Sequence, residues 1–156
     1  MFETVLSEWG GVDILINNAG YQVEGASHEI ASSDFTRVVA ANLTGAFLCA
    51  QHTLRHLLAA EKPGVIINVS SVHEIIPKPG FVGYSVSKGG MQNLTRTLAL
   101  EYASRGIRVN GLGPGATVTP MIAPRNIATP ISAMLAMSCV ISVVTTAISM
   151  PIMPKR

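Results

Sequence analysis

A tyrosine and a lysine lie four positions apart in the stretch GYSVSKGG, residues 83–90. Residues at this spacing share one face of a helix, so Tyr84 and Lys88 would lie side by side. A free tyrosine has a pKa of about 10 and is a poor base at neutral pH, but a lysine cation nearby favours the phenolate. Such a tyrosine can exchange a proton with an alcohol or carbonyl oxygen. Taken alone, the pair more often marks an ordinary helix surface, so other residues must decide.

A serine in NVSS, residues 68–71, favours the chemical interpretation. Ser71 ends a β-branched apolar run and lies thirteen residues before Tyr84, across a loop rich in glycine and proline. A hydroxyl at a strand end can hydrogen-bond the substrate oxygen while the tyrosine transfers the proton. Ser70 is the competing choice. Because neighbouring strand residues point to opposite faces, we expect only one of the two serines to face the site.

The elements that must position these residues alternate between strand and helix. The hydrophobic pattern predicts strands at 12–16, 65–71 and 107–115, a short helix at 2–9, and long helices at about 33–61 and 84–104. Ser32 or Ser33 is expected to cap the first long helix. Such alternation implies right-handed crossovers and a parallel sheet with helices on both faces. We therefore expect an α/β fold with a partial doubly wound, Rossmann-type sheet of three recognisable strands.

Unusual residues gather where each predicted strand ends. They occupy positions 17–20, 70–71 and 113–119. In parallel α/β sheets, ligands bind outside the carboxyl ends of the strands. All three strands therefore indicate one ligand site at the same edge of the sheet.

Together these features resemble the short-chain dehydrogenase/reductase family over roughly residues 2–122. The matching residues are NNAG at 17–20, Asn42 in ANLTGAF, Ser71 in NVSS, Tyr84 and Lys88 in YSVSK, and PGATVT at 114–119. The stretches SSVHE and YSVSKGGM most resemble bacterial glucose 1-dehydrogenases, and then 3-oxoacyl-carrier-protein reductases. The resemblance implies an NAD- or NADP-dependent oxidoreductase acting on the alcohol or carbonyl group of a small sugar, polyol or oxo-acyl substrate. It also implies a homo-oligomer, a tetramer in the family.

The resemblance further implies a role for each matching residue. Tyr84 would be the catalytic acid/base, and Ser71 would orient the substrate oxygen. Lys88 would stabilise the phenolate and hydrogen-bond the nicotinamide ribose. Asn42 would lie at a helix irregularity that holds a water between Lys88 and solvent. The adenosine side of the cofactor would lie against Asn18, Ala19 and Gly20. Its nicotinamide end would lie against Pro114, Gly115 and Thr119. An epimerase or dehydratase also uses a Y-x-x-x-K pair, but NNAG and the spacing of Ser71 favour a dehydrogenase.

Composition and charge limit the other functional classes that the sequence could indicate. The net charge is +2 with no basic run, so the sequence does not indicate a nucleic-acid-binding protein. Cys49 and Cys139 match no ligand spacing, and MFETVLSEWGG lacks the basic region of a secretory signal, so we expect a cytoplasmic protein. His52 and His56 have the spacing of a zinc pair, but no third ligand is evident. We expect helix-surface histidines and no metal site.

The family's glycine-rich T-G-x-x-x-G-x-G loop, which binds the cofactor pyrophosphate, does not occur in the sequence. Its absence predicts impaired cofactor binding by the isolated chain and leaves the choice between NAD and NADP open. It also predicts a bare hydrophobic edge on the strand at 12–16. The alternative to an enzyme is a catalytically inactive fragment that acts as an oligomerisation module. Its contact surface would include Leu94, Leu98 and Tyr102.

The end of the chain departs from the family pattern. No charged side chain occurs in residues 126–154. We therefore expect a partial catalytic domain at 1–122 and an atypical tail at 123–156. The tail fits a truncated or frame-shifted reading frame, a divergent buried family tail, or a membrane helix at 131–150.

Overall fold

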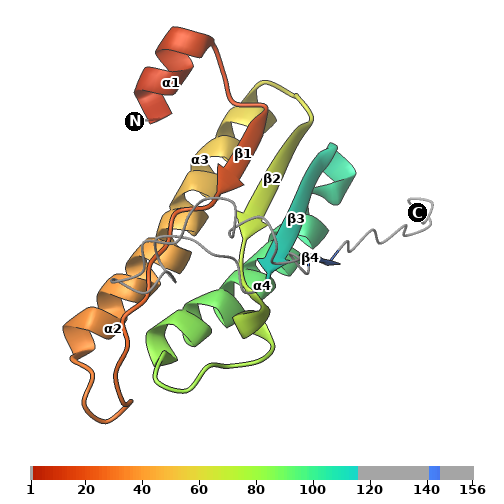
Figure 1. Cartoon of the computed structure of the whole chain (residues 1–156). Helices are drawn as coiled ribbons and strands as arrows, with labels where there is room; N and C mark the ends of the chain where they lie inside the picture. Colours follow the sequence, from red (N-terminus) through yellow and green to blue (C-terminus); the bar gives the residue numbers. More distant parts are fainter. Residues whose placement is uncertain (1, 116–140, 145–156) are drawn as a thin grey trace, which may run out of the picture.

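The structure is a computed structural model that describes residues 2–115 and 141–144 of the chain. In these residues four strands form one sheet in the order β1-β2-β3-β4 (Figure 1). They are β1 (Ile14–Asn17), β2 (Gly64–Val69), β3 (Ile107–Pro114) and β4 (Ile141–Val144). The first three strands are parallel, whereas β4 runs antiparallel to β3. The predicted α/β fold with a partial Rossmann-type sheet is confirmed, and β4 is a strand that the sequence analysis did not foresee.

The long helix predicted at about 33–61 consists of three segments in continuous helical conformation. They are α2 (Ser32–Val39), the π turn η1 (Ala40–Thr44) and α3 (Gly45–Ala59). Helix α2 begins at Ser32, but its N-cap is Ala31 and no side chain bonds the free N–H groups there, so the predicted serine cap is wrong. The other helical segments are α1 (Phe2–Trp9), the short turns η2 (Val72–Glu74) and η3 (Ala103–Arg105), and α4 (Val82–Tyr102).

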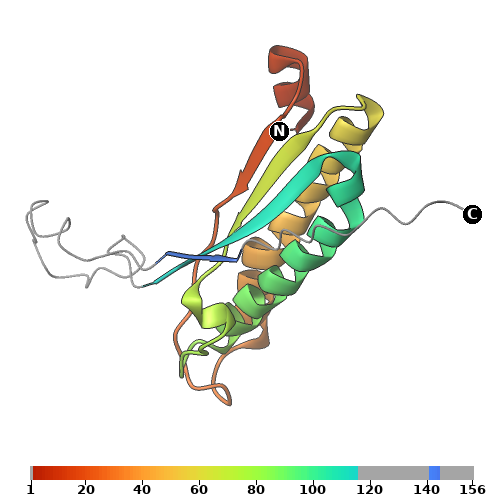
Figure 2. The ribbon, with the colours of Figure 1, turned by 90° about the vertical axis from the view of Figure 1, so that its right-hand side faces the viewer.

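Helices α3 and α4 cover the same face of the sheet, as Figure 2 shows. The strands β1, β2 and β3 follow one another in one direction across the sheet. Right-handed crossovers taken in one direction place their helices on one side. The expectation of helices on both faces is therefore not met in the described part of the chain, and Ile14 and Ile16 of β1 stay 62% and 59% exposed.

The core lies between this covered face and the two helices. Its buried residues come from α3, α4 and the two inner strands, and are Ala50, Leu54, Leu57, Ile66, Leu98, Ile107 and Val109. Burial of a valine, leucine or isoleucine side chain contributes about 1.5–3 kcal/mol, and together these side chains fix α3 and α4 on the sheet. Leu94 and Tyr102 pack against this cluster. Leu98 thus lies in the core, Leu94 and Tyr102 are half-buried beside it, and a role of these residues in an oligomer surface stays a prediction.

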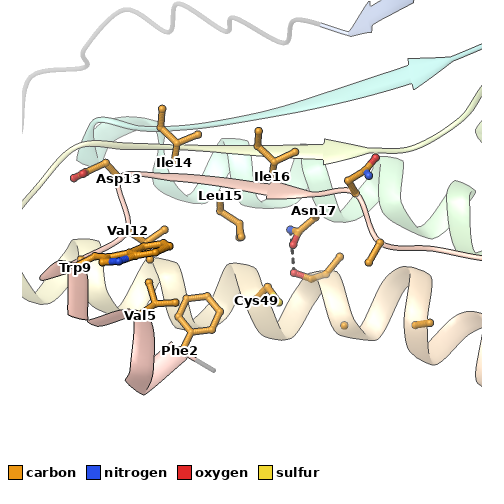
Figure 3. A pocket seen from close by; sticks show the side chains of 16 residues that line it. Phe2, Val5, Trp9, Val12, Asp13, Ile14, Leu15, Ile16, Asn17 and Cys49 are labelled. Carbon is orange, nitrogen blue, oxygen red and sulfur yellow. Dashed lines mark hydrogen bonds between the residues drawn. The ribbon is translucent and has the colours of Figure 1, made fainter. Parts of the chain in front are cut away.

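Strand β1 ends the sheet in the described residues, and an apolar pocket of about 640 Å³ opens beside it (Figure 3). Phe2, Val5 and Trp9 of α1 and Cys49 of α3 line the pocket together with β1. Trp9 is 77% exposed. The bare hydrophobic edge expected for this strand is therefore present, and an edge of this kind favours unwanted association between chains.

Several expectations for the tail concern residues 116–140 and 145–156, which lie outside the described residues, as do Thr119 and the boundary at 122. Where the tail is described, Ile141–Val144 pair as a strand with β3, which does not fit a membrane helix over 131–150. Within residues 2–115 and 141–144, no helix is long and apolar enough to cross a membrane.

Candidate active site

Lys88 lies in the first half of α4 and faces the carboxyl end of β2. Its ammonium Nζ donates a hydrogen bond to the Val69 carbonyl oxygen at 2.8 Å. The residue is only 4% exposed. Burial lowers the pKa of Lys88 to about 8, and the Glu74 carboxylate opposes this in part. Within residues 2–115 and 141–144 the Val69 carbonyl is its one hydrogen-bond acceptor, so the ammonium keeps two further N–H groups to donate elsewhere.

Tyr84 lies one helical turn before Lys88, on the same face, as the spacing predicts. The Nζ atom of Lys88 is 5.6 Å from the centre of the Tyr84 ring. His73 of η2 meets the Tyr84 ring edge-on, with 6.1 Å between the ring centres. The tyrosine ring is therefore held between the lysine and the turn that follows β2.

The two serines after β2 separate, as expected for neighbouring residues of an extended chain. The Ser70 hydroxyl donates to the Lys88 carbonyl oxygen at 3.3 Å and so faces α4. The Ser71 hydroxyl accepts the backbone N–H of His73 at 3.2 Å and so caps η2. Ser71 thus uses its hydroxyl oxygen as an acceptor, whereas Ser70 donates its hydroxyl proton inside the fold.

The end of β3 lies beside Ser71. A Cβ atom built on Gly113 would be 3.6 Å from the carbonyl oxygen of Ser71 and 3.7 Å from the Glu74 carboxylate. Pro114 ends β3 and Gly115 follows it, so both residues lie at the same edge of the sheet as Ser71. The structure thus gathers the ends of β2 and β3 at one place, as the sequence predicts.

Asn42 occupies the π turn and is fully buried. Its Oδ1 accepts the Tyr21 N–H at 2.9 Å, and its Nδ2 donates to the Tyr21 carbonyl at 2.9 Å and to the Ser87 hydroxyl at 3.0 Å. A π turn is a local widening of a helix, so the irregularity implied by the family resemblance is present. Asn42 therefore ties the loop after β1 to α4.

Gly20 is the point where the loop after β1 approaches Lys88. A Cβ atom at this position would lie 3.0 Å from Oδ1 of Asn42 and 3.8 Å from Nζ of Lys88. Asn18 and Ala19, in contrast, line the pocket beside β1. Gly20 thus lies close to Asn42 and Lys88, while Asn18 and Ala19 line the pocket at the outer edge of the sheet.

Replacing Gly20 by alanine is expected to lower the free energy of unfolding by about 1–3 kcal/mol, the usual cost of overpacking. Three hydrogen bonds hold Asn42, so its amide cannot move away from the added methyl group. Urea unfolding of Gly20→Ala measures this loss. Gly25→Ala is the matched control, because a Cβ there meets only Ile30 atoms at 3.8–3.9 Å. Equal unfolding curves for the two variants would contradict the tight approach at Gly20.

Two participants in this site escaped the sequence analysis. Ser87 bonds Asn42 and also donates to the Tyr84 carbonyl at 2.7 Å. Its position three residues after Tyr84 could have indicated it. The Val69 carbonyl that holds Lys88 carries no signal in the sequence, because every residue has a carbonyl.

The two histidines of α3 pack against α1 and its following loop. His52 stacks on the Phe2 ring with 5.1 Å between ring centres. His56 turns its buried Nε2 toward Gly11, where an added Cβ would come within 2.6 Å. The expectation of plain helix-surface histidines is therefore wrong for His56.

Known proteins resemble this chain over most of its length. The family model for short chain dehydrogenase matches residues 1–129. A 3beta-hydroxysteroid dehydrogenase 1 of Eggerthella lenta is 50% identical over 125 residues, covering 80% of this chain and 48% of the relative. A glucose 1-dehydrogenase of Gluconobacter oxydans is 54% identical over 112 residues, covering 72% of this chain and 42% of the relative.

A solved structure agrees with these relatives. It is a gluconate 5-dehydrogenase of Burkholderia cenocepacia, in complex with NADP and tartrate, with a TM-score of 0.73 and 33% identity over 77% of this chain and 47% of that one. The chain thus spans about half the length of the relatives that it matches. The family model covers most of the chain, and the fold and motif order agree with it. The chain therefore belongs to the short-chain dehydrogenase family.

Proposed function

We propose that the chain carries the proton-transfer side of an NAD(P)-dependent oxidoreductase site, which oxidises an alcohol group of a small sugar or polyol or reduces the corresponding carbonyl. The observation that carries this proposal is the buried Lys88 ammonium, bonded to the Val69 carbonyl beside the Tyr84 ring. A buried lysine with a pKa lowered to about 8, facing a tyrosine at a sheet edge, is typical of a functional site.

In this proposal Tyr84 takes the proton of the substrate hydroxyl during oxidation and returns it during reduction. Ser71 donates its hydroxyl proton to the same substrate oxygen and holds it near the tyrosine. Lys88 stabilises negative charge on the tyrosine oxygen. Asn42 keeps the loop at Tyr21 and helix α4 in fixed relative positions through its three hydrogen bonds.

The described residues fit a nicotinamide dinucleotide at this edge. Gly20 leaves a space beside Lys88 that a Cβ would fill, and the lysine keeps N–H groups for a ribose hydroxyl. The bound nicotinamide would supply or accept the hydride, while Pro114 and Gly115 would border its ring at the end of β3. NAD and NADP both remain candidates, since the residue that would choose between them is not among these.

The relatives support one class of substrate over others. One curated relative is a glucose 1-dehydrogenase, and the solved neighbour is a gluconate 5-dehydrogenase, which supports a polyhydroxylated substrate. We propose glucose as the first substrate to test, with a 3-oxoacyl thioester as the second. Homo-oligomeric assembly, which the family resemblance implies, stays a prediction.

Calorimetric titration with NAD and with NADP, followed by a turnover assay with glucose, tests the proposal. Weak heat of binding for one of the cofactors and slow formation of reduced nicotinamide, seen by its absorbance, are the expected results, in line with the impaired cofactor binding predicted from the sequence. The proposal is overturned if no heat of binding and no turnover are detected while light scattering shows a defined oligomer. That outcome would support the alternative of an inactive interaction module.

A further inference from the structure

Three consecutive residues of β2 and its end each bond to helix α4. The Asn68 side-chain Nδ2 donates to the Thr95 hydroxyl at 2.9 Å. The Val69 carbonyl accepts from Lys88 Nζ at 2.8 Å, and the Ser70 hydroxyl donates to the Lys88 carbonyl at 3.3 Å. Two of these bonds hold Lys88 itself, while the first reaches the helix two turns further on.

The Asn68 side chain is also the middle of a longer chain of hydrogen bonds. Its Oδ1 accepts from Asn17 Nδ2 of β1 at 2.8 Å, and the two residues lie opposite each other in the strand register. Asn17 Nδ2 donates in addition to the Ala46 carbonyl of α3 at 3.2 Å, the dashed line in Figure 3. At the other end the Thr95 hydroxyl donates to the Met91 carbonyl at 2.8 Å. This chain of hydrogen bonds therefore connects α3, β1, β2 and α4 without a break.

The three polar side chains of this hydrogen-bond chain are buried inside the fold. Asn68 is fully buried, and Asn17 and Thr95 are 9% and 8% exposed. Burying amide and hydroxyl groups costs free energy unless they find partners, and each of these three side chains makes at least two hydrogen bonds. Apolar contacts tolerate sliding of a helix along a strand, whereas hydrogen bonds have direction and define one position.

We propose that Asn17, Asn68 and Thr95 are positioning residues, which fix helix α4 along β2 and thereby hold the Lys88 ammonium against the Val69 carbonyl. Lys88 and Thr95 are seven residues apart on α4, about 10 Å along a rigid helix. A displacement of the helix at Thr95 is therefore transmitted to Lys88. The catalytic relevance of this placement rests on the proposed function, but the placement itself does not.

The pKa of Lys88 reports how closely the ammonium is held. Burial lowers this pKa to about 8, so an ammonium released toward water would titrate closer to the ordinary value of 10.5. Among the described residues, the titratable groups facing it are Tyr84 on its own helix and Glu74 on η2. Neither of them bonds to the polar chain, so a change at Thr95 leaves their charges in place.

The test compares Thr95→Val, which keeps the shape but removes both hydrogen bonds, with Thr95→Ser, which keeps the hydroxyl. Thr97→Val is the matched control, because Thr97 is exposed on the same helix. The rate of Lys88 acylation by an amine-reactive ester is measured against pH by peptide mass spectrometry. Thr95→Val is expected to move the midpoint upward by roughly one unit. Thr95→Ser and Thr97→Val are expected to retain the wild-type midpoint.

An unchanged Lys88 midpoint in a folded Thr95→Val variant would overturn the proposal, even if thermal stability falls, because the hydrogen bonds would then serve stability alone. If Thr95→Val does not fold, Thr95→Ala replaces it with the same criterion. Acylation needs no turnover. Failure of the proposed function would therefore show as absent cofactor binding, and failure of this proposal as an unmoved midpoint.

Discussion

The Tyr84→Phe variant is expected to lose turnover, with kcat about 100- to 10,000-fold below that of the wild-type protein. Phenylalanine keeps the ring that contacts His73 and faces the Lys88 ammonium, so the packing of the site survives. Only the hydroxyl to which the proposal assigns the proton exchange with the substrate is removed. Steady-state kinetics with the cofactor and substrate identified by titration measure the effect, and cofactor affinity should change little.

Tyr102→Phe is the matched control, since Tyr102 lies at the far end of the same helix and packs against the core. It should retain wild-type kcat. A Tyr84→Phe enzyme that turns over within a factor of a few of wild type would show that another group transfers the proton. Circular dichroism of both variants establishes that each has folded.

The Lys88→Met variant is expected to be inactive and yet more stable than the wild-type protein. At pH 7 the buried ammonium is kept charged, although burial lowers its pKa from 10.5 to about 8. This difference corresponds to about 3 kcal/mol that the folded state loses relative to the unfolded chain. Removing the hydrogen bond to Val69 offsets about 1 kcal/mol of the gain. A net increase of about 2 kcal/mol in the free energy of unfolding is therefore expected from urea titration.

The pH dependence of the free energy of unfolding of the wild-type protein tests the sign of the Lys88 contribution independently. The pKa of Lys88 is lower in the folded state, so between pH 8 and 10.5 the unfolded chain binds more protons at this residue. The contribution of Lys88 to stability therefore rises with pH across that window and is constant below it. In Lys88→Met this rise should be missing, whereas Lys62→Met, a change at an exposed lysine, should retain it. A Lys88→Met protein less stable than wild type at pH 7 would contradict the argument.

Both predictions concern residues that the sequence alone brought forward. Tyr84 and Lys88 are four residues apart on one helix, so their closeness needs only the helix period. Ser71 required more, namely that the carboxyl ends of parallel strands meet at one edge. The order and spacing of NNAG, Asn42, Ser71 and the pair then identified the family. Thr119 stays a prediction, as do the catalytic roles of all these residues.

Other features could not be foreseen, because they depend on contacts between distant segments. The Val69 carbonyl that binds Lys88 and the Tyr21 backbone that binds Asn42 are groups that every residue possesses. Leu98 looked like a surface residue of an assembly, but the direction of α4 turns it into the core. The antiparallel strand β4 has the β-branched sequence ISVV, which is compatible with a strand, but its pairing with β3 depends on contacts between distant segments.

The sequence by itself determined the fold class, the family and the identity of the candidate catalytic side chains, because periodicity and motif spacing are local properties of a chain. Only the tertiary structure decided how α4 is held on β2, through Asn17, Asn68 and Thr95. It also decided that α3 and α4 cover one face of the sheet (Figure 2). The physical reason is that hydrogen bonds between buried groups far apart in the chain exist only once the strands are paired. The chemistry of Tyr84 and Lys88 can thus be read along the chain, whereas the bonds that place them arise from folding.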